Sequence, residues 1–204
     1  VDGMYSTVQT TVAARAAGLP IVYGAELTLA WDALRGIVAG SSAPGWGLAP
    51  GAEDPGMRLP ILAASPSGYA NLVGAMSERA LSEPGQRKPR HDLVNLSEAG
   101  GGLVALTGGR RGPLMRALRA GGALSARRVL DVLVDAFGRD HVLVEWQGVR
   151  GDEDEVGEVL AELARASGTR LVATSGARMS SPSKQALGDI LAANRLGSSL
   201  DEAE

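Results

Sequence analysis

The sequence predicts an α/β fold in which short parallel strands alternate with helices around an aliphatic core. Apolar residues make up 45% of the 204 residues, but aromatic residues only 3%. The core must therefore consist of Val, Leu, Ile and Ala, which suits parallel strands covered by helices. Five short apolar runs are also each followed by a helical or loop-rich stretch. This is the pattern of repeated βα units, in an open sheet or a closed barrel.

Local signals mark the ends of the expected elements. Gly18, Gly138 and Gly168 follow helical stretches in the way of C-terminal caps. Ser65 and Pro66 suit the N-cap and the first position of a helix. The expected helices cover residues 5–17, 65–81, 113–120, 125–137, 152–167 and 181–195, and the expected strands cover 19–23, 59–63, 103–107, 141–146 and 170–174.

Residues 30–58 are expected to form a loop-rich insertion in a single domain that spans residues 1–204. Gly, Pro and Ser dominate this stretch, and Trp31 and Trp46 are its only large anchors. The chain begins without an initiator methionine and stops without a capped helix, so we expect it to be a piece of a longer protein.

Composition excludes several classes of function. The net charge of −3 gives no overall electrostatic signal for nucleic acid. The absence of cysteine excludes disulfides and thiol catalysis and fits a cytoplasmic location. No apolar run approaches the roughly 18–20 residues needed to cross a bilayer, and no secretory signal is present, so no membrane partner is expected.

Functional groups of a parallel α/β protein gather at the carboxyl ends of its strands. In this chain those ends carry two carboxylates, Glu26 and Glu145, which we expect to face the same opening at the carboxyl ends of the strands. Paired acids can bind a hard cation or act as acid and base. No His or Asp accompanies them, however, so buried acids held by backbone N–H groups or Arg are the favoured interpretation. The other strand ends are expected at residues 63–65, 107–111 and 174–178.

The remaining polar motifs are weaker. His91 lies in a basic loop and His141 at the start of a strand, so both are expected at a surface or boundary rather than at a site. Residues 107–112 read Thr-Gly-Gly-Arg-Arg-Gly and suggest an anion-binding turn, with a simple glycine turn as the favoured alternative. The basic residues 87–90 are expected to form a solvated loop, and the acidic residues 152–155 the first turn of a helix.

Several short sequence motifs, taken in order, resemble those of the polymerase and histidinol phosphatase (PHP) domain of bacterial replicative DNA polymerase alpha subunits. The likeness is strongest to the error-prone alpha-type subunits used in damage tolerance, and it covers essentially the whole chain. The motifs are Asp2-Gly3-Met4-Tyr5, Tyr23-Gly24-Ala25-Glu26-Leu27, Leu59-Pro60-Ile61-Leu62-Ala63, Gly68-Tyr69-Ala70-Asn71-Leu72, Lys88-Pro89-Arg90-His91-Asp92-Leu93, Leu106-Thr107-Gly108-Gly109-Arg110-Arg111-Gly112, Phe137-Gly138-Arg139-Asp140-His141-Val142, Val172-Ala173-Thr174 and Ala193-Asn194-Arg195.

The resemblance implies a distorted seven-unit (β/α) barrel, N-terminally incomplete here, with parallel strands and outer helices, at the start of a much larger polymerase. Family members with intact sites bind divalent metals (Mn, Zn or Mg) and hydrolyse phosphoesters. It also implies partners: the rest of the polymerase chain, DNA through the full-length protein, and accessory subunits of replication or damage tolerance.

The chain departs from the metal-binding pattern of this family. The family's histidine before Asp-Gly is Val1, a later histidine is replaced around Arg79, and a frequent cysteine is Gly109. The late Asp-x-His pair falls on Gly176 and Arg178, so that of the matched ligands only Glu26 remains, as a vestigial metal ligand. We therefore expect no catalytic residue and no cofactor in this stretch. A further hypothesis is that Arg178 places a cation where the metal would sit and pairs with Glu26.

Three interpretations follow. The first is a non-catalytic, structural PHP portion of an error-prone DNA polymerase, an enzyme of translesion synthesis and DNA repair whose nucleotidyl transfer resides elsewhere in the chain. The second is a stand-alone, metal-dependent PHP phosphoesterase, against which the missing imidazoles argue. The third is a decayed gene fragment with no present function.

Overall fold

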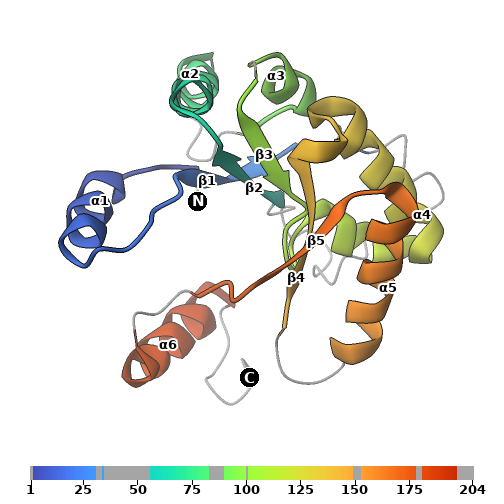
Figure 1. Cartoon of the computed structure of the whole chain (residues 1–204). Helices are drawn as coiled ribbons and strands as arrows, with labels where there is room; N and C mark the ends of the chain where they lie inside the picture. Colours follow the sequence, from blue (N-terminus) through green and yellow to red (C-terminus); the bar gives the residue numbers. More distant parts are fainter. Residues whose placement is uncertain are drawn as a thin grey trace. The chain divides into compact units, whose positions relative to one another are not determined.

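Helices and a five-stranded sheet make up the part of the chain that the computed structural model describes, residues 2–30, 34, 56–82, 90–99, 101–148, 153–177 and 181–196 (Figure 1). The helices are α1 (Thr7–Ala16), α2 (Pro66–Ser82), α3 (Leu93–Glu98), α4 (Pro113–Phe137), α5 (Glu153–Ser167) and α6 (Gln185–Leu196), with short 3-10 helices η2 (Arg139–His141) and η3 (Pro182–Lys184). The strands are β1 (Gly24–Leu29), β2 (Met57–Ala63), β3 (Leu103–Leu106), β4 (Val142–Gln147) and β5 (Arg170–Thr174).

The sheet is mixed, and its strands follow one another in chain order, β1-β2-β3-β4-β5. Strand β2 runs antiparallel to both β1 and β3, whereas β3, β4 and β5 are parallel. The α/β class is confirmed, but the expectation of parallel strands throughout is wrong at β2. Because β2 is reversed, residues 63–65 lie at the edge opposite the carboxyl ends of β1, β3, β4 and β5.

The strand expected over residues 19–23 is wrong, because the strand begins at Gly24 and runs to Leu29. In this segment Ala25, Leu27 and Leu29 alternate inward and are at most 7% exposed. Leu19 and Val22 are instead 63% and 66% exposed. The apolar run was visible in the sequence, but the period-2 alternation that follows it is the stronger strand signal.

One face of the sheet packs against α2, α4 and α5 and forms the core. Its strand positions are inward-facing aliphatic residues such as Leu27, Leu59, Ile61 and Val144, all fully buried. The helices contribute mainly leucines, namely Leu72, Leu96, Leu114, Leu130, Leu133 and Leu160. We call the opposite face of the sheet, which carries Glu26, Thr28, Arg58, Glu145 and Thr174, the second face.

Helix ends follow the local signals. The hydroxyl of Ser65 accepts the backbone N–H of Gly68 at 3.0 Å, so Ser65 caps α2 as expected. The two helices expected over residues 113–137 are a broken α4, interrupted at Gly121 and Gly122. Helix α3 was not expected, although Asp92 caps it by accepting the N–H of Val94. The insertion over residues 30–58 lies almost entirely outside the described residues, and its last two residues, Met57 and Arg58, belong to β2.

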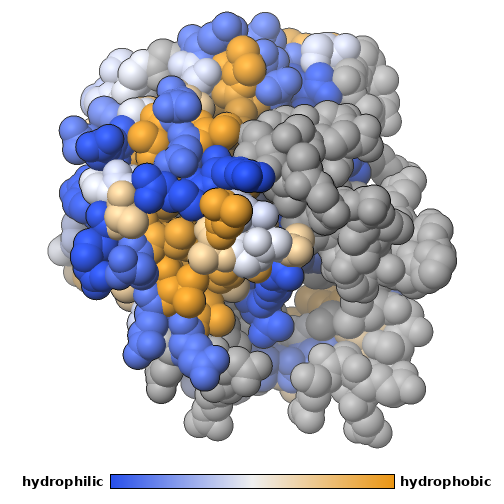
Figure 2. Space-filling view, turned by 90° about the vertical axis from the view of Figure 1, so that its right-hand side faces the viewer, coloured by the Kyte–Doolittle hydropathy of each residue, from blue (hydrophilic) through white to orange (hydrophobic). Residues whose placement is uncertain are grey.

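The chain divides into two compact units, Val1–Thr174 and Ser175–Glu204. In the first unit, α1 has no buried residue. The hydroxyl of Thr11 in α1 is hydrogen-bonded to the hydroxyl of Tyr23 at 3.1 Å, and the ring of Tyr23 makes an edge-to-face contact with Tyr69 of α2, with ring centroids 5.6 Å apart. The second unit holds η3 and α6. On the face shown in Figure 2, apolar patches are interrupted by hydrophilic side chains. None of the helices in the described ranges is long and apolar enough to cross a membrane.

Candidate functional site

Three polar side chains, Asp2, Thr28 and Arg58, form a closed network that we call the Asp2 cluster. Thr28 of β1 and Arg58 of β2 face each other in the antiparallel register. Asp2 Oδ1 accepts the backbone N–H of Thr28 at 2.5 Å, and Oδ2 accepts the Thr28 hydroxyl at 2.6 Å. Nη1 of Arg58 lies 3.4 Å from Oδ2 and also donates to Thr28 Oγ1. The side chains of Arg58 and Asp2 are only 13% and 10% exposed, so this ion pair is largely shielded from water.

Glu26, the predicted vestigial metal ligand, lies in the middle of β1 and not at its carboxyl end. It is half-buried and faces Pro60 of β2. Its backbone carbonyl accepts the N–H of Asp2 at 2.9 Å, so the Asp2 cluster begins directly beside it. Side chains alternate along a strand, which places Glu26 on the same face of the sheet as Thr28. A metal-binding role for Glu26 stays a prediction.

Glu145 of β4 is the centre of a second polar group on the second face. Its side chain is 3% exposed, and Oε1 accepts hydrogen bonds from Gln147 Nε2 at 2.9 Å and from the Thr174 hydroxyl at 2.5 Å. The backbone N–H of Glu145 donates to Thr107 Oγ1 at 2.9 Å. Oε2 has no hydrogen-bond partner among the described residues. The acid is thus buried as expected, but side chains of β4 and β5 hold its carboxylate rather than backbone N–H groups or Arg.

The register shows how the two carboxylates are arranged. Glu26 of β1 pairs with Pro60 of β2. The same row of paired residues continues across β3 to Leu143 of β4, which lies two residues before Glu145. Both acids therefore lie on the second face, but β2 and β3 separate them.

His91 is buried and does not lie at the surface, contrary to the sequence-based expectation. It is 3% exposed because its backbone pairs with β1: its N–H donates to Thr28 O at 2.7 Å, and its carbonyl accepts from Ala30 at 2.9 Å. Burial lowers the pKa of His91; Asp2 partly opposes this shift and Arg79 adds to it. The bridge to Leu29 places its side chain on the helix-covered face, away from the Asp2 cluster. His141 is exposed at the start of β4, as predicted.

The turn over residues 107–112 has a structural explanation. Gly108 has a φ of +76°, and a Cβ there would collide with the carbonyl of Arg58 and with Gly112. The N–H of Gly112 donates to Gly109 O at 2.7 Å, and Pro113 then begins α4. Gly108 and Gly112 are thus required by close backbone packing, as a simple glycine turn predicts. An anion-binding role is not needed to account for them.

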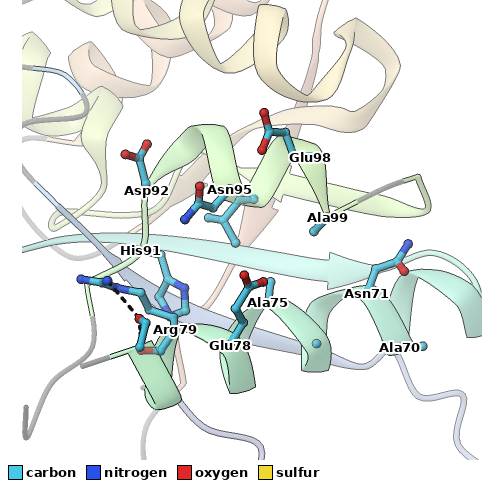
Figure 3. Close-up of a pocket in the computed structure, with 13 residues that line it drawn as sticks. Ala70, Asn71, Ala75, Glu78, Arg79, His91, Asp92, Asn95, Glu98 and Ala99 are labelled. Atoms are coloured by element: carbon cyan, nitrogen blue, oxygen red, sulfur yellow. Dashed lines mark hydrogen bonds between the residues drawn. The ribbon is translucent and has the colours of Figure 1, made fainter. Parts of the chain in front are cut away.

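A polar pocket of about 610 Å³ lies between α2 and α3 (Figure 3). Helix α2 contributes Glu78 and Arg79, while His91 and Asn95 come from the segment of α3. Arg79 donates to the carbonyl of Arg90 and, at 3.3 Å, to Ser82, which fixes its guanidinium at one end of the pocket. Nothing in the described part of the chain identifies what would bind here.

The residues present do not fit a metal cluster of the kind that the resemblance implies. In the part of the chain that the structure describes, no three His, Cys, Asp or Glu side chains are grouped so that they could hold a metal ion. Both carboxylate oxygens of Asp2 are already bonded, and the adjacent cation is Arg58. At the position of the frequent cysteine, Gly109, the end of the Gln147 side chain occupies the space of a Cβ, so a larger residue there would require this side chain to move. Arg178 and the basic residues 87–89 lie outside the described residues.

Sequence reasoning missed the Asp2 cluster. In the sequence, Asp2 lies in one of the short motifs that resemble the family, and Arg58 is the last residue of the expected loop-rich insertion. No local pattern could have joined residues that are 56 positions apart. The burial of His91 had a usable signal, however, because Asp92 with Leu93 and Leu96 is the pattern of a capped helix packed on a core.

The mixed sheet, the helices on one face and the polar groups on the second face define an α/β domain of the type that the sequence resemblance indicated. The chain belongs to the PHP domain family, whose model matches residues 2–148.

Its named relatives are error-prone DNA polymerases. The chain is 37% identical over 204 residues to the one from Mycolicibacterium paratuberculosis, 36% identical over 204 residues to the one from Mycobacterium tuberculosis H37Rv, and 37% identical over 207 residues to the one from Cutibacterium acnes. These alignments cover 99% to 100% of this chain but 17% of each relative. The chain thus spans about one sixth of the length of the relatives it matches.

Proposed function

We propose that this chain is the PHP portion of an error-prone DNA polymerase and that it acts there as a structural domain with a vestigial metal site. One observation carries the proposal: relatives of that name align with nearly every residue of the chain at 36–37% identity. Nucleotidyl transfer for translesion synthesis and DNA repair would then reside in the remainder of the polymerase. The partners are that remainder, DNA through the full-length protein, and accessory subunits, in the cytoplasm.

In this proposal residues 1–204 form one domain, and the five-stranded sheet is part of a closed (β/α) barrel. The second face of the sheet would be its interior, which fits the polar and half-buried residues found there. Glu26 is the remaining member of the ligand set, and the fragment needs no cofactor. Support for the loss of metal comes from the donor set, because Asp2 is neutralised by Arg58 and the described residues contain no three-ligand group.

The gene around this sequence tests the polymerase proposal. We expect the reading frame to continue for several hundred codons beyond Glu204 and to encode the paired carboxylates that hold the metal ions of nucleotidyl transfer. A stop codon shortly after Glu204 would contradict it.

The alternative, a stand-alone phosphoesterase, predicts a different result. The purified chain should then hydrolyse bis(p-nitrophenyl) phosphate when Mn²⁺ is added and lose that activity with a chelator. We expect no hydrolysis above that of a matched sample in which Glu26 and Glu145 are both replaced by Gln.

A further inference from the structure

Two exposed arginines lie close together at the start of α4. Arg110 belongs to the turn that follows β3, and Arg119 lies in the first half of α4, before the break at Gly121. A guanidinium N–H of Arg119 donates to the backbone carbonyl of Arg110 at 3.4 Å. No carboxylate in the described ranges forms an ion pair with either side chain. Two neighbouring cations are therefore left without a counter-charge there.

The two charges oppose each other. Partial burial lowers the pKa of Arg119, and the positive charge of Arg110 lowers it further. Like charges this close are unfavourable unless an anion compensates them. Other arginines of the described ranges have such an anion, since Arg58, Arg127 and Arg165 each form an ion pair with an acid. The pair at the start of α4 thus lacks the anion that these arginines have.

The turn that carries Arg110 is held in place by its backbone. The carbonyl of Arg111 accepts the N–H of Arg58 in β2 at 2.9 Å, and the N–H of Gly112 donates to the carbonyl of Gly109 at 2.7 Å. Neither bond uses the side chain of Arg110. The glycines therefore explain the shape of the turn, but they do not explain why two arginines meet beside it. A fixed turn lowers the entropy cost of binding, because Arg110 is already near Arg119 before a ligand arrives.

We infer that Arg110 and Arg119 together bind a phosphate group of the DNA backbone. A guanidinium presents five N–H donors in a fixed planar fork, which matches the oxygens of a phosphate. Arg119 uses one donor on the carbonyl of Arg110, so the others remain for a ligand. Phosphate contacts carry no sequence information, so the binding should be independent of the base sequence.

The inference rests on the proposed function for the source of the phosphate, because DNA is the polyanion that a polymerase handles. It goes further by assigning a DNA contact to this portion of the chain. The net charge of −3 does not oppose this contact, because salt screens exposed charges beyond about 8–10 Å and only the local pair acts. With two cations the affinity should be low, and log K should fall against log [salt] with a slope of about −1.4 for a single strand.

The test is the fluorescence anisotropy of a labelled single-stranded oligonucleotide of mixed sequence, titrated with the whole chain between about 20 and 150 mM NaCl. Arg110→Gln combined with Arg119→Gln removes both cations. Arg127→Gln combined with Arg165→Gln is the matched control, because it removes the same charge from surface arginines that already have acid partners. Arg110→Lys combined with Arg119→Lys keeps the charge without the planar fork. Thermal unfolding checks that each variant folds.

We expect the unaltered chain to bind the oligonucleotide at low salt and to release it as the salt concentration rises. The variant without Arg110 and Arg119 should bind at least about tenfold more weakly and lose most of the salt dependence. The control should stay within about twofold of the unaltered chain, because its arginines are already neutralised by acids. The Lys variant should lie between them, because the charge remains but the bidentate geometry is lost.

Inorganic pyrophosphate, compared at equal ionic strength, shows the source of the phosphate. If it binds the unaltered chain more tightly than the oligonucleotide does, the site serves a free phosphate compound and the inference is wrong. Absence of oligonucleotide binding, or an equal loss in the control, also overturns it. These results leave the proposed function standing, because that proposal rests on the relatives and is tested by the reading frame beyond Glu204. If the variant without both cations does not fold, Arg119→Gln alone is compared with Arg127→Gln.

Discussion

At the scale of single residues, the two best-defined acids of the second face differ in how their charge is compensated. Asp2 has a cation at Arg58, whereas the described part of the chain gives Glu145 only neutral donors, Gln147 and Thr174. A buried carboxylate with neutral donors and one unbonded oxygen is costly to keep charged. The two sites should therefore respond differently when their charges are removed.

Glu145→Gln should leave the free energy of unfolding within about 1 kcal/mol of its original value, or raise it. The amide oxygen can still accept from Gln147 and Thr174, and the charge is gone. Glu145→Ala leaves these donors without a partner and should cost at least about 2 kcal/mol. Urea denaturation of the two variants measures the difference. An equal loss in both would mean that the charge itself is needed and would contradict this account.

His91 predicts a pH dependence of stability. Burial holds its pKa below the usual 6.5, so the unfolded chain takes up a proton before the folded chain does. The folded state therefore loses stability as the pH falls below about 6.5, with a slope of at most about 1.4 kcal/mol per pH unit from this residue, down to the folded pKa. His91→Gln should weaken the loss between pH 7 and 5 in chemical denaturation.

The matched control for His91 is His141→Gln, since His141 is the only other histidine and is exposed. It should keep the pH profile of the unaltered chain. Identical profiles for the two variants would contradict the role assigned to the buried imidazole.

At the scale of elements, glycines decide where helices break. Gly122 has a φ of 68° and a ψ of −167° and separates the two halves of α4. Gly74 lies inside the regular helix α2, and a Cβ at either position would meet nothing within 4 Å. Gly122→Ala should therefore cost about 1–3 kcal/mol through backbone strain alone. Gly74→Ala should stabilise by about 0.5–1 kcal/mol. Urea denaturation checks both, and shifts of the same sign would contradict this explanation.

The same scale shows what the sequence could predict. The ends of α2 and α4 were foreseen because Ser65 and Gly138 act on their own chain neighbours. The direction of β2 was not foreseen, because it is set by pairing with residues about 30 to 45 positions away. The sequence predicts a strand over residues 19–23 with a second extended piece over residues 27–29, and only the second lies in β1. The apolar run is the weaker signal, and the alternation that begins at Ala25 marks the strand. Within the site, the burial of Glu145 was predicted from its place in an apolar strand, but the Asp2–Arg58 pair depends on tertiary contacts alone.

At the scale of the whole molecule, the proposed function implies that this PHP domain folds without a bound metal, because Asp2 is paired with Arg58 and the described residues contain no three-ligand group. This agrees with the proposal, because the chain spans about one sixth of the length of the error-prone DNA polymerases it matches and the chemistry would reside in the remainder. The central claim is therefore about metal content. Elemental mass spectrometry of the purified chain, after growth in medium containing Mn²⁺ and Zn²⁺, measures it directly. The account predicts far less than one metal ion per chain, and a ratio of one or more that survives gel filtration would contradict it.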